Sequence, residues 1–434
     1  MSTSSDRANK AARFLHKVKN VDQLMEKIKG KKPNSHPNGK FPIEGHVTKE
    51  GTEKRLEYLK HHGKEFQYLT GDKTFSDLES LHGNIENFIG FSMVPTGVIG
   101  PLNIIGTDAN GDFYVPLATS EGALVASYGR GARASRMAGG ITSICIIEGV
   151  QRSPVFKFDN IASLGEFVMW VLKQAEKFHE IVAVTSRHAQ LIDMKTNIEG
   201  NHLILTFDYL TGDAAGQNMV TLVTDAICQY IVRESPVKPV FWFIESNYSG
   251  DKKATALSFS SVRGKKVTAE VEIPQDIVKS VLRTTTQNMV NYWQSSTLGV
   301  IQSGAIGAQG HVANGLCALF IATGQDAACT AEAAVGITRM EMKANGDLYA
   351  CLTLPNLVVG TVGGGTSLPT QRECLELLDC YGAGKGRKFA EICGALALAG
   401  ELSIAAALSA GHFSQAHKKF GRKQKEKSTT VLDK

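Results

Sequence analysis

Hydrophobic and polar positions alternate along residues 154–242 in a way that predicts helices and short strands. Apolar residues at helical spacing cover residues 161–179, and mainly apolar runs at 181–185 and 203–209 predict strands. A glycine-containing turn follows the second run, and helical spacing resumes at about 218–232. We therefore expect residues 154–242 to form a small α/β unit that is separate from the rest of the chain.

The pattern on both sides of this unit predicts a larger domain. Alternating hydrophobic residues at 113–117 predict a strand that leads to Glu121. Two later stretches, 305–334 and 389–408, are rich in Ala and Gly at helical spacing, which lets helices pack closely. We expect an N-terminal helical leader (1–82), a large domain in two parts (83–153 and 243–410), the small domain (154–242) and a mobile basic C-terminal flap (411–434).

Composition is that of an ordinary globular protein. The chain has 434 residues, of which 43% are hydrophobic and 21% charged, and its formal net charge of +5 is too small to imply nucleic acid. The eight cysteines are scattered without metal-ligand spacing, so we expect reduced thiols, no bound metal and a cytoplasmic protein. The most apolar stretch, 392–408, contains Glu401 and is expected to be too short to span a membrane. No apolar segment typical of a signal peptide follows the first residues.

Two glycine-rich segments, 212–219 and 360–366, could bring backbone N–H groups close to a phosphate. The first lies between a predicted strand and a predicted helix, where the helix dipole adds positive potential. Its glycine spacing differs from the G-x-G-x-x-G fingerprint, which disfavours an ordinary Rossmann domain. A third segment, 118–122, brings the carboxylate of Glu121 to a predicted helix start.

Together these segments resemble the soluble catalytic portion of class I 3-hydroxy-3-methylglutaryl-CoA (HMG-CoA) reductases, and the resemblance extends from about Glu86 to His417. It implies an α+β fold, in which a large helix-rich substrate domain surrounds a central helix and carries an inserted ferredoxin-like, non-Rossmann NADP-binding domain. The implied reaction is the NADPH-dependent four-electron reduction of (3S)-HMG-CoA to (R)-mevalonate and CoA, by two hydride transfers through mevaldehyde. The implied assembly is a homodimer or homotetramer with active sites between subunits, without nucleic acid or membrane.

Reduction of a thioester needs a cation beside the carbonyl oxygen and proton sources for the alkoxide and the thiolate. By resemblance, Glu121 donates a proton and Lys252 stabilises the oxyanion. Asp326 would link these two residues and tune their pKa values, and His417 would protonate the leaving thiolate from the C-terminal flap. The residue pattern alone independently favours Asp326, because a carboxylate in an apolar, small-residue region is expected to be buried and paired.

The resemblance also assigns binding residues. Arg152 and Lys253 would hold the substrate's free carboxylate, and Asp251 would contact the acyl group together with Lys253. Asn314 would join the catalytic network and Arg130 would contact CoA. The residues expected to bind the cofactor are Ser186, Arg187, Asp213, Asn218, Gly363, Gly364 and Gly365. A guanidinium at position 187 suits a 2′-phosphate, so NADPH is favoured over NADH.

Three departures from the family pattern lie near the acyl end of the expected site. Glu245 stands where serine is usual, Ser295-Ser296 where a second carboxylate-binding lysine is usual, and Cys329-Thr330 where the family has Gln-Asn. Two alternatives therefore stay open. One is a related reductase that acts on another acyl-CoA, and the other is a non-catalytic paralogue that binds CoA or NADPH.

Overall fold

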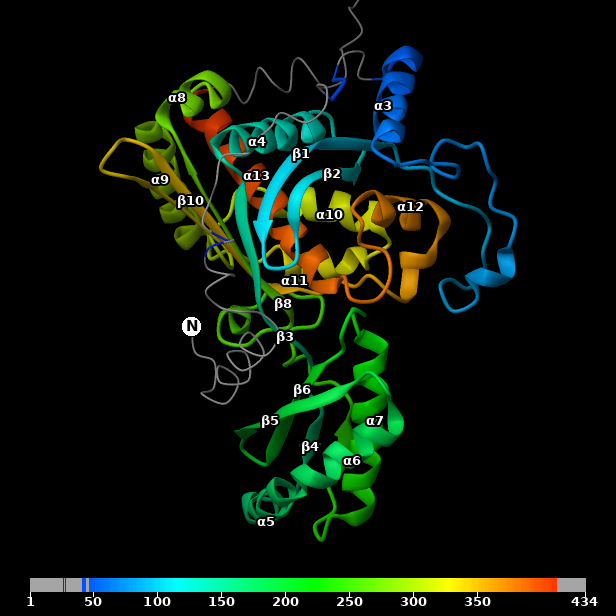
Figure 1. The fold of residues 1–434 in the computed structure, drawn as a ribbon. Helices are drawn as coiled ribbons and strands as arrows, with labels where there is room; N and C mark the ends of the chain where they lie inside the picture. Colours follow the sequence, from blue (N-terminus) through cyan, green and yellow to red (C-terminus); the bar gives the residue numbers. More distant parts are fainter. Residues whose placement is uncertain (1–25, 27, 29–40, 44–46, 412–434) are drawn as a thin grey trace, which may run out of the picture.

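One ten-stranded sheet connects two parts of the molecule in the computed structural model, which describes residues 26, 28, 41–43 and 47–411 (Figure 1). The main strand order is β7-β4-β6-β3-β8-β10-β9, while β1 pairs with β2 and β3, and β5 pairs with β6. The strands are β1 (Thr96–Gly106), β2 (Asn110–Ala118), β3 (Ile141–Arg152), β4 (Val155–Lys157), β5 (Gln190–Glu199), β6 (His202–Leu210), β7 (Phe241–Phe243), β8 (Gly264–Ile273), β9 (Ile337–Met342) and β10 (Leu348–Leu357).

Helix α13 (Gly386–Ser409) lies at the centre of the larger part and is buried along most of its length. A neighbouring helix packs closely against α13 where both helices have small residues. A side chain at Gly131 of that helix would collide with the carbonyl oxygen of Ala399 in α13. The other helices of this part are α3 (Lys49–His61), α4 (Leu124–Ala138), α8 (Gln275–Ile277), α9 (Thr286–Ser303), α10 (Val312–Thr323), α11 (Thr330–Ala333) and α12 (Pro369–Leu377).

Glu401 of α13 has a buried carboxylate that receives hydrogen bonds from other segments of the chain. It accepts hydrogen bonds from the backbone N–H groups of Gly310 (2.7 Å) and His311 (2.8 Å) and from the Thr338 hydroxyl (2.7 Å). The helix has 24 residues, so it is longer than the apolar stretch 392–408 and could cross a membrane by length and composition alone. Because 83% of its apolar window is buried inside the described structure, α13 serves here as a core helix.

The smaller part has the element order β4, α5–α6, β5, β6, α7, β7, with helices α5 (Ile161–Val171), α6 (Ala175–Thr185) and α7 (Gln217–Glu234). Its strands pair in the order β7-β4-β6-β5, and every pairing is antiparallel. A separate hydrophobic cluster fills the space between this sheet and the helices. The predicted strand at 203–209 and helix at 218–232 correspond to β6 and α7 and are confirmed.

The predicted strand at 181–185 is wrong, because these residues form the end of α6. Ile181, Val182 and Val184 are β-branched and by themselves favour a strand. The helix continues through them because Phe178 and Val182, four positions apart, both bury their side chains in the core of the smaller part. Tertiary packing therefore overrides the local preference.

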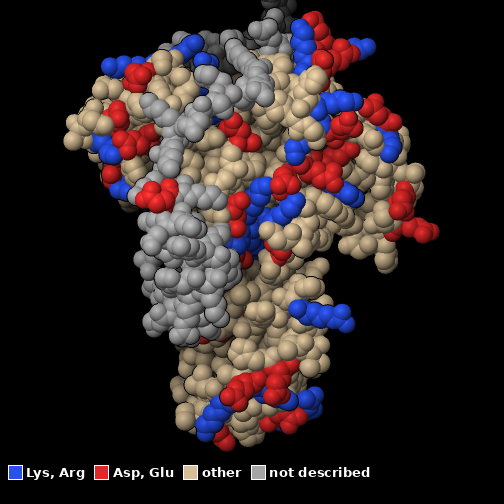
Figure 2. Space-filling view, in the orientation of Figure 1, with Lys and Arg blue, Asp and Glu red and all other residues tan. Residues whose placement is uncertain are grey.

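Strand β3 belongs to both parts. Residues 142–149 pair with β8 of the larger part, and residues 150–152 pair with β6 of the smaller part. Arg152, the last residue of β3, consequently lies where the two parts meet. Figure 2 shows that basic and acidic side chains are interspersed on the visible face, in keeping with the modest net charge of +5.

Candidate active site

Lys252 and Asp326 form an ion pair although 73 residues separate them in the sequence. Lys252 Nζ lies 2.9 Å from Asp326 Oδ2, and the two side chains are 45% and 43% exposed. Lys252 is held in a turn with φ of +56°, and its N–H donates to the Glu332 carboxylate (3.1 Å). Asp326 pairs with Lys252 as expected, its link to Glu121 stays a prediction, and its expected burial is wrong. Helix α10 ends at Thr323, and the left-handed Gly324 turns the chain outward before Asp326.

This ion pair keeps both groups charged near neutral pH. The hydrogen bond to Asp326 raises the pKa of Lys252, against the smaller effect of partial burial. Partial burial acts to raise the pKa of Asp326, but the hydrogen bonds from Lys252 and from the Ala328 N–H outweigh it and lower the pKa overall. Lys252 is therefore suited to stabilise negative charge on an oxygen.

Glu121 and Asn314 form a second polar pair. Asn314 Nδ2 donates to Glu121 Oε2 at 2.8 Å, and the Glu121 side chain is exposed. Helix α4 begins only at Leu124, after Ala123 with φ of +72°, so Glu121 lies in the turn before the helix and not in its first turn. The pair brings a carboxylate to one end of α10, since Asn314 lies in the first turn of that helix.

The two pairs lie at opposite ends of α10 within one chain. Asn314 is in the first turn of this helix, and Asp326 follows its last residue, Thr323. The helical rise separates positions 314 and 323 by ~14 Å. Within one chain, the Glu121–Asn314 and Lys252–Asp326 pairs therefore form two separate polar clusters.

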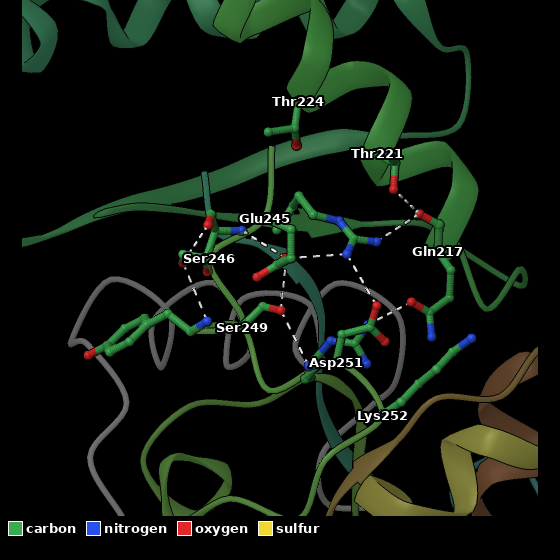
Figure 3. A network of polar contacts seen from close by, with 12 residues as sticks. Gln217, Thr221, Thr224, Glu245, Ser246, Ser249, Asp251 and Lys252 are labelled. Atoms are coloured by element: carbon green, nitrogen blue, oxygen red, sulfur yellow. Dashed lines mark hydrogen bonds and ion pairs between the residues drawn. The ribbon is translucent and has the colours of Figure 1, made fainter. Parts of the chain in front are cut away.

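Beside the Lys252 turn, Arg152 and Arg263 hold an ionic network with nearby carboxylates. Arg152 contacts the carboxylates of Glu245 and Asp251, both at 3.2 Å. Arg263 contacts Asp251 at 2.8 Å and is also paired with Glu332. Figure 3 shows Glu245, Ser249 and Asp251 pointing toward this centre. The network fixes the turn that carries Lys252.

Sequence reasoning missed Arg263, Glu332 and the side chain of Gln217. Arg263 is 2% exposed and Glu332 is fully buried, and Arg263 also donates to Gln217 Oε1 at 2.7 Å. Burial raises the pKa of Glu332, although the adjacent Arg263 opposes that rise. Glu332, like Asp326, lies in a stretch of small residues, where a carboxylate is expected to be buried and paired. The same reasoning could therefore have identified Glu332, which is buried as expected, whereas Asp326 is not.

The glycine-rich segment 360–366 lies next to the residues that precede Asp326. The Gly360 N–H donates to Gln325 Oε1 (2.8 Å), and a side chain at Gly324 would collide with the carbonyl oxygen of Gly365. Gly363 and Gly364 have positive φ angles (+74° and +56°), and a side-chain carbon at either would meet open space. These two glycines thus expose backbone toward the surface beside the Lys252–Asp326 pair.

The other expected binding residues have varied surroundings. The Asp213 carboxylate accepts the N–H groups of Gly384 and Gly386 at 2.7 and 2.8 Å, which ties the 212–216 turn to the start of α13. Arg130 donates to Ser403 Oγ at 3.0 Å. Lys253 Nζ donates to the backbone oxygen of Asp251 at 2.9 Å.

In the smaller part, Ser186 directly follows α6, and its hydroxyl accepts the N–H groups of His188 and Ala189. Arg187 and Asn218 are exposed, and Asn218 lies in the first turn of α7. His417 lies outside the described residues. The cofactor-binding roles of these residues and the role of His417 stay predictions.

Comparison with known proteins identifies the family. The family model for hydroxymethylglutaryl-coenzyme A reductase matches residues 51–422. A 3-hydroxy-3-methylglutaryl-coenzyme A reductase of Pyrococcus horikoshii is 40% identical over 93% of this chain and 98% of its own length. One from Aeropyrum pernix is 44% identical over 80% of this chain and 84% of its own length.

Solved structures agree in fold. The class II 3-hydroxy-3-methylglutaryl-CoA reductase from Streptococcus pneumoniae, in a structure with bound NADPH, aligns with a TM-score of 0.64 at 20% identity. The alignment covers 82% of this chain and 96% of that protein. The resemblance seen in the sequence is confirmed, and the chain belongs to the hydroxymethylglutaryl-coenzyme A reductase family.

Proposed function

We propose that the protein catalyses the NADPH-dependent reduction of (3S)-HMG-CoA to (R)-mevalonate and CoA. The observation that carries this proposal is the Lys252–Asp326 ion pair beside the open Gly363-Gly364 turn. A fixed ammonium next to exposed glycine backbone suits a carbonyl that receives hydride from a nicotinamide held against that turn. When bound, NADPH supplies the hydride, and two molecules account for the four electrons of the reaction.

Lys252 would stabilise the oxyanion in both halves of the reaction. After the first hydride adds to the thioester carbon, the oxyanion collapses, the C–S bond breaks and mevaldehyde forms. The CoA thiolate takes a proton, for which His417 is the proposed donor. After the second hydride adds to the aldehyde, the alkoxide takes its proton from Glu121, which Asn314 orients through its 2.8 Å hydrogen bond.

We propose a homodimer, or a tetramer built from dimers, in which each active site combines two chains. Glu121 and Lys252 must reach the same oxygen, yet they lie at opposite ends of α10 in one chain. A second copy that brings its Glu121 to the first copy's Lys252 would complete the site. The interface would then be required for turnover.

The smaller part is proposed to be the NADP-binding domain. Its βαββαβ order and antiparallel strand order β7-β4-β6-β5 support a ferredoxin-like unit over a parallel Rossmann sheet. Its separate hydrophobic cluster supports domain boundaries near residues 154 and 242. The eight free cysteines support a cytoplasmic location.

NADPH oxidation by the purified protein tests the reaction. HMG-CoA should stimulate it and release free CoA and mevalonate, whereas NADPH alone should not be consumed. Mixed preparations of Glu121→Gln and Lys252→Ala, each inactive alone, should regain activity on subunit exchange. No stimulation by HMG-CoA would refute the reaction, and no recovery on mixing would refute the shared site.

A further inference from the structure

The guanidinium of Arg152 is already occupied by carboxylates of its own chain. Its Nη1 contacts Glu245 Oε2 and Asp251 Oδ2, each at 3.2 Å, and its Nη2 donates to the Gln217 backbone oxygen at 3.3 Å. Arg152 is only 6% exposed. A carboxylate from a substrate could bind Arg152 only by competing with one of these internal partners.

Glu245 is the partner that such a substrate could displace. Asp251 is also paired with Arg263, so it is held from two sides. Glu245 uses a single oxygen, Oε2, for Arg152, for the Ser249 hydroxyl (3.0 Å) and for the Ser153 N–H (3.4 Å). Its other oxygen, Oε1, is buried and makes no hydrogen bond within the described structure. A buried acceptor without a donor costs free energy, which lowers the cost of releasing Glu245.

Charges around this centre are balanced. The described cations that face it are Arg152, Arg263, Lys252 and Lys253, and the described anions are Glu245, Asp251, Glu332 and Asp326. Both guanidinium groups are paired with carboxylates, whereas the described structure records no ion pair for Lys253, whose Nζ donates to a backbone oxygen. An anion that binds Arg152 must therefore lose its hydration without gaining an unpaired guanidinium in return.

We propose that Glu245 is a specificity-determining residue, whose carboxylate takes the position on Arg152 that a free carboxylate at the acyl end of the substrate would otherwise occupy. Arg152 then contributes little to discrimination between acyl-CoA substrates with and without that carboxylate. This inference rests on the proposed reductase function and refines its substrate class. It applies to binding at the acyl end, so it concerns KM more than kcat.

The test compares HMG-CoA with 3-hydroxy-3-methylbutyryl-CoA, which keeps the hydroxyl and methyl groups but lacks the free carboxylate. The measured quantity is the ratio of kcat/KM for the two substrates. In the wild type, HMG-CoA should be preferred by no more than ~10-fold. Glu245→Gln keeps the size of the side chain and can still accept from Arg152, but it removes the charge. It should raise the ratio on the order of tenfold, mainly by lowering KM for HMG-CoA.

Glu199→Gln is the matched control. Glu199 lines the same hollow as Glu245, a cavity of about 400 Å³, and its replacement also removes one negative charge. In Glu199→Gln, the ratio of kcat/KM for the two substrates should stay within about twofold of the wild type.

An unchanged ratio or a higher KM for HMG-CoA in Glu245→Gln would overturn the inference. A wild-type preference for HMG-CoA clearly above ~10-fold would also overturn it, and this measurement does not depend on the folding of a variant. If neither acyl-CoA is reduced, the proposed function itself fails; if HMG-CoA is reduced but the ratio is insensitive to Glu245, only this inference fails.

Discussion

Replacing Lys252 by alanine should separate catalysis from stability. The variant removes the ammonium that lies 2.9 Å from Asp326, but both side chains are nearly half exposed. The loss of such a pair costs at most ~1 kcal/mol of folding free energy. Alanine keeps the Cβ atom, so the strain at φ of +56° is the same as with lysine. The fold should therefore survive.

Turnover should fall much further. Removing one group that stabilises an oxyanion costs ~3 kcal/mol, which corresponds to a loss of about two orders of magnitude in kcat. Steady-state NADPH oxidation with saturating HMG-CoA measures kcat, and thermal unfolding measures stability in the same preparation. Lys177→Ala is the matched control, because Lys177 forms a surface ion pair with Glu180 at 2.8 Å away from the site. A folded Lys252→Ala variant that keeps kcat within about tenfold of the wild type would refute the assignment.

Three further predictions address the cofactor, the proton donors and pH. Arg187→Ala should raise KM for NADPH far more than for NADH; equal effects would contradict a 2′-phosphate contact. His417→Gln should abolish reduction of the acyl-CoA but spare reduction of added mevaldehyde, which Glu121→Gln should impair; equal loss of both reactions in His417→Gln would contradict a leaving-group role. For Glu401, burial acts to raise the pKa, but His311 and the backbone donors outweigh it and lower the pKa below the ordinary 4.5. Its stabilisation is present above that value and is lost as pH falls through the lowered pKa, so Glu401→Gln should reduce the pH dependence of the unfolding free energy on the acid side. An unchanged acid-side slope would exclude this role.

Local patterns predicted the elements whose signals lie within a short window. The strand at 203–209, the turn after it and the helix at 218–232 depend on apolar runs and glycine, and all three are present. The run at 181–185 failed because its β-branched residues favour strand locally, while the core of the smaller part selects helix. Which conformation wins depends on packing partners that are distant in the sequence.

In the candidate site, too, some features could be predicted from local motifs, while others depend on contacts between distant segments. The residue types of the Lys252–Asp326 and Glu121–Asn314 pairs were available from motifs, and the structure brings each pair within hydrogen-bond distance. The pairing of Arg263 with Glu332 carries no local signal, because it brings the residue before β8 next to α11, about 70 positions later in the chain. The ion pair between Arg152 and Glu245 could not be predicted from the sequence either, although the unusual glutamate was visible there.

The shared strand β3 has a consequence for protein engineering. Residues 150–152 hydrogen-bond to β6, so the smaller part starts structurally before its apparent boundary at 154. If only residues 154–242 were replaced by those of another protein, the new strand in place of β6 would have to pair in register with residues 150–152 of the original chain. The replacement would also remove Gln217, whose backbone oxygen accepts from Arg152 and whose side chain accepts from Arg263. A chimera designed to change cofactor preference should therefore carry its own equivalent of Val150–Arg152 and of the Gln217 contacts, or the turn that carries Lys252 will lose its support.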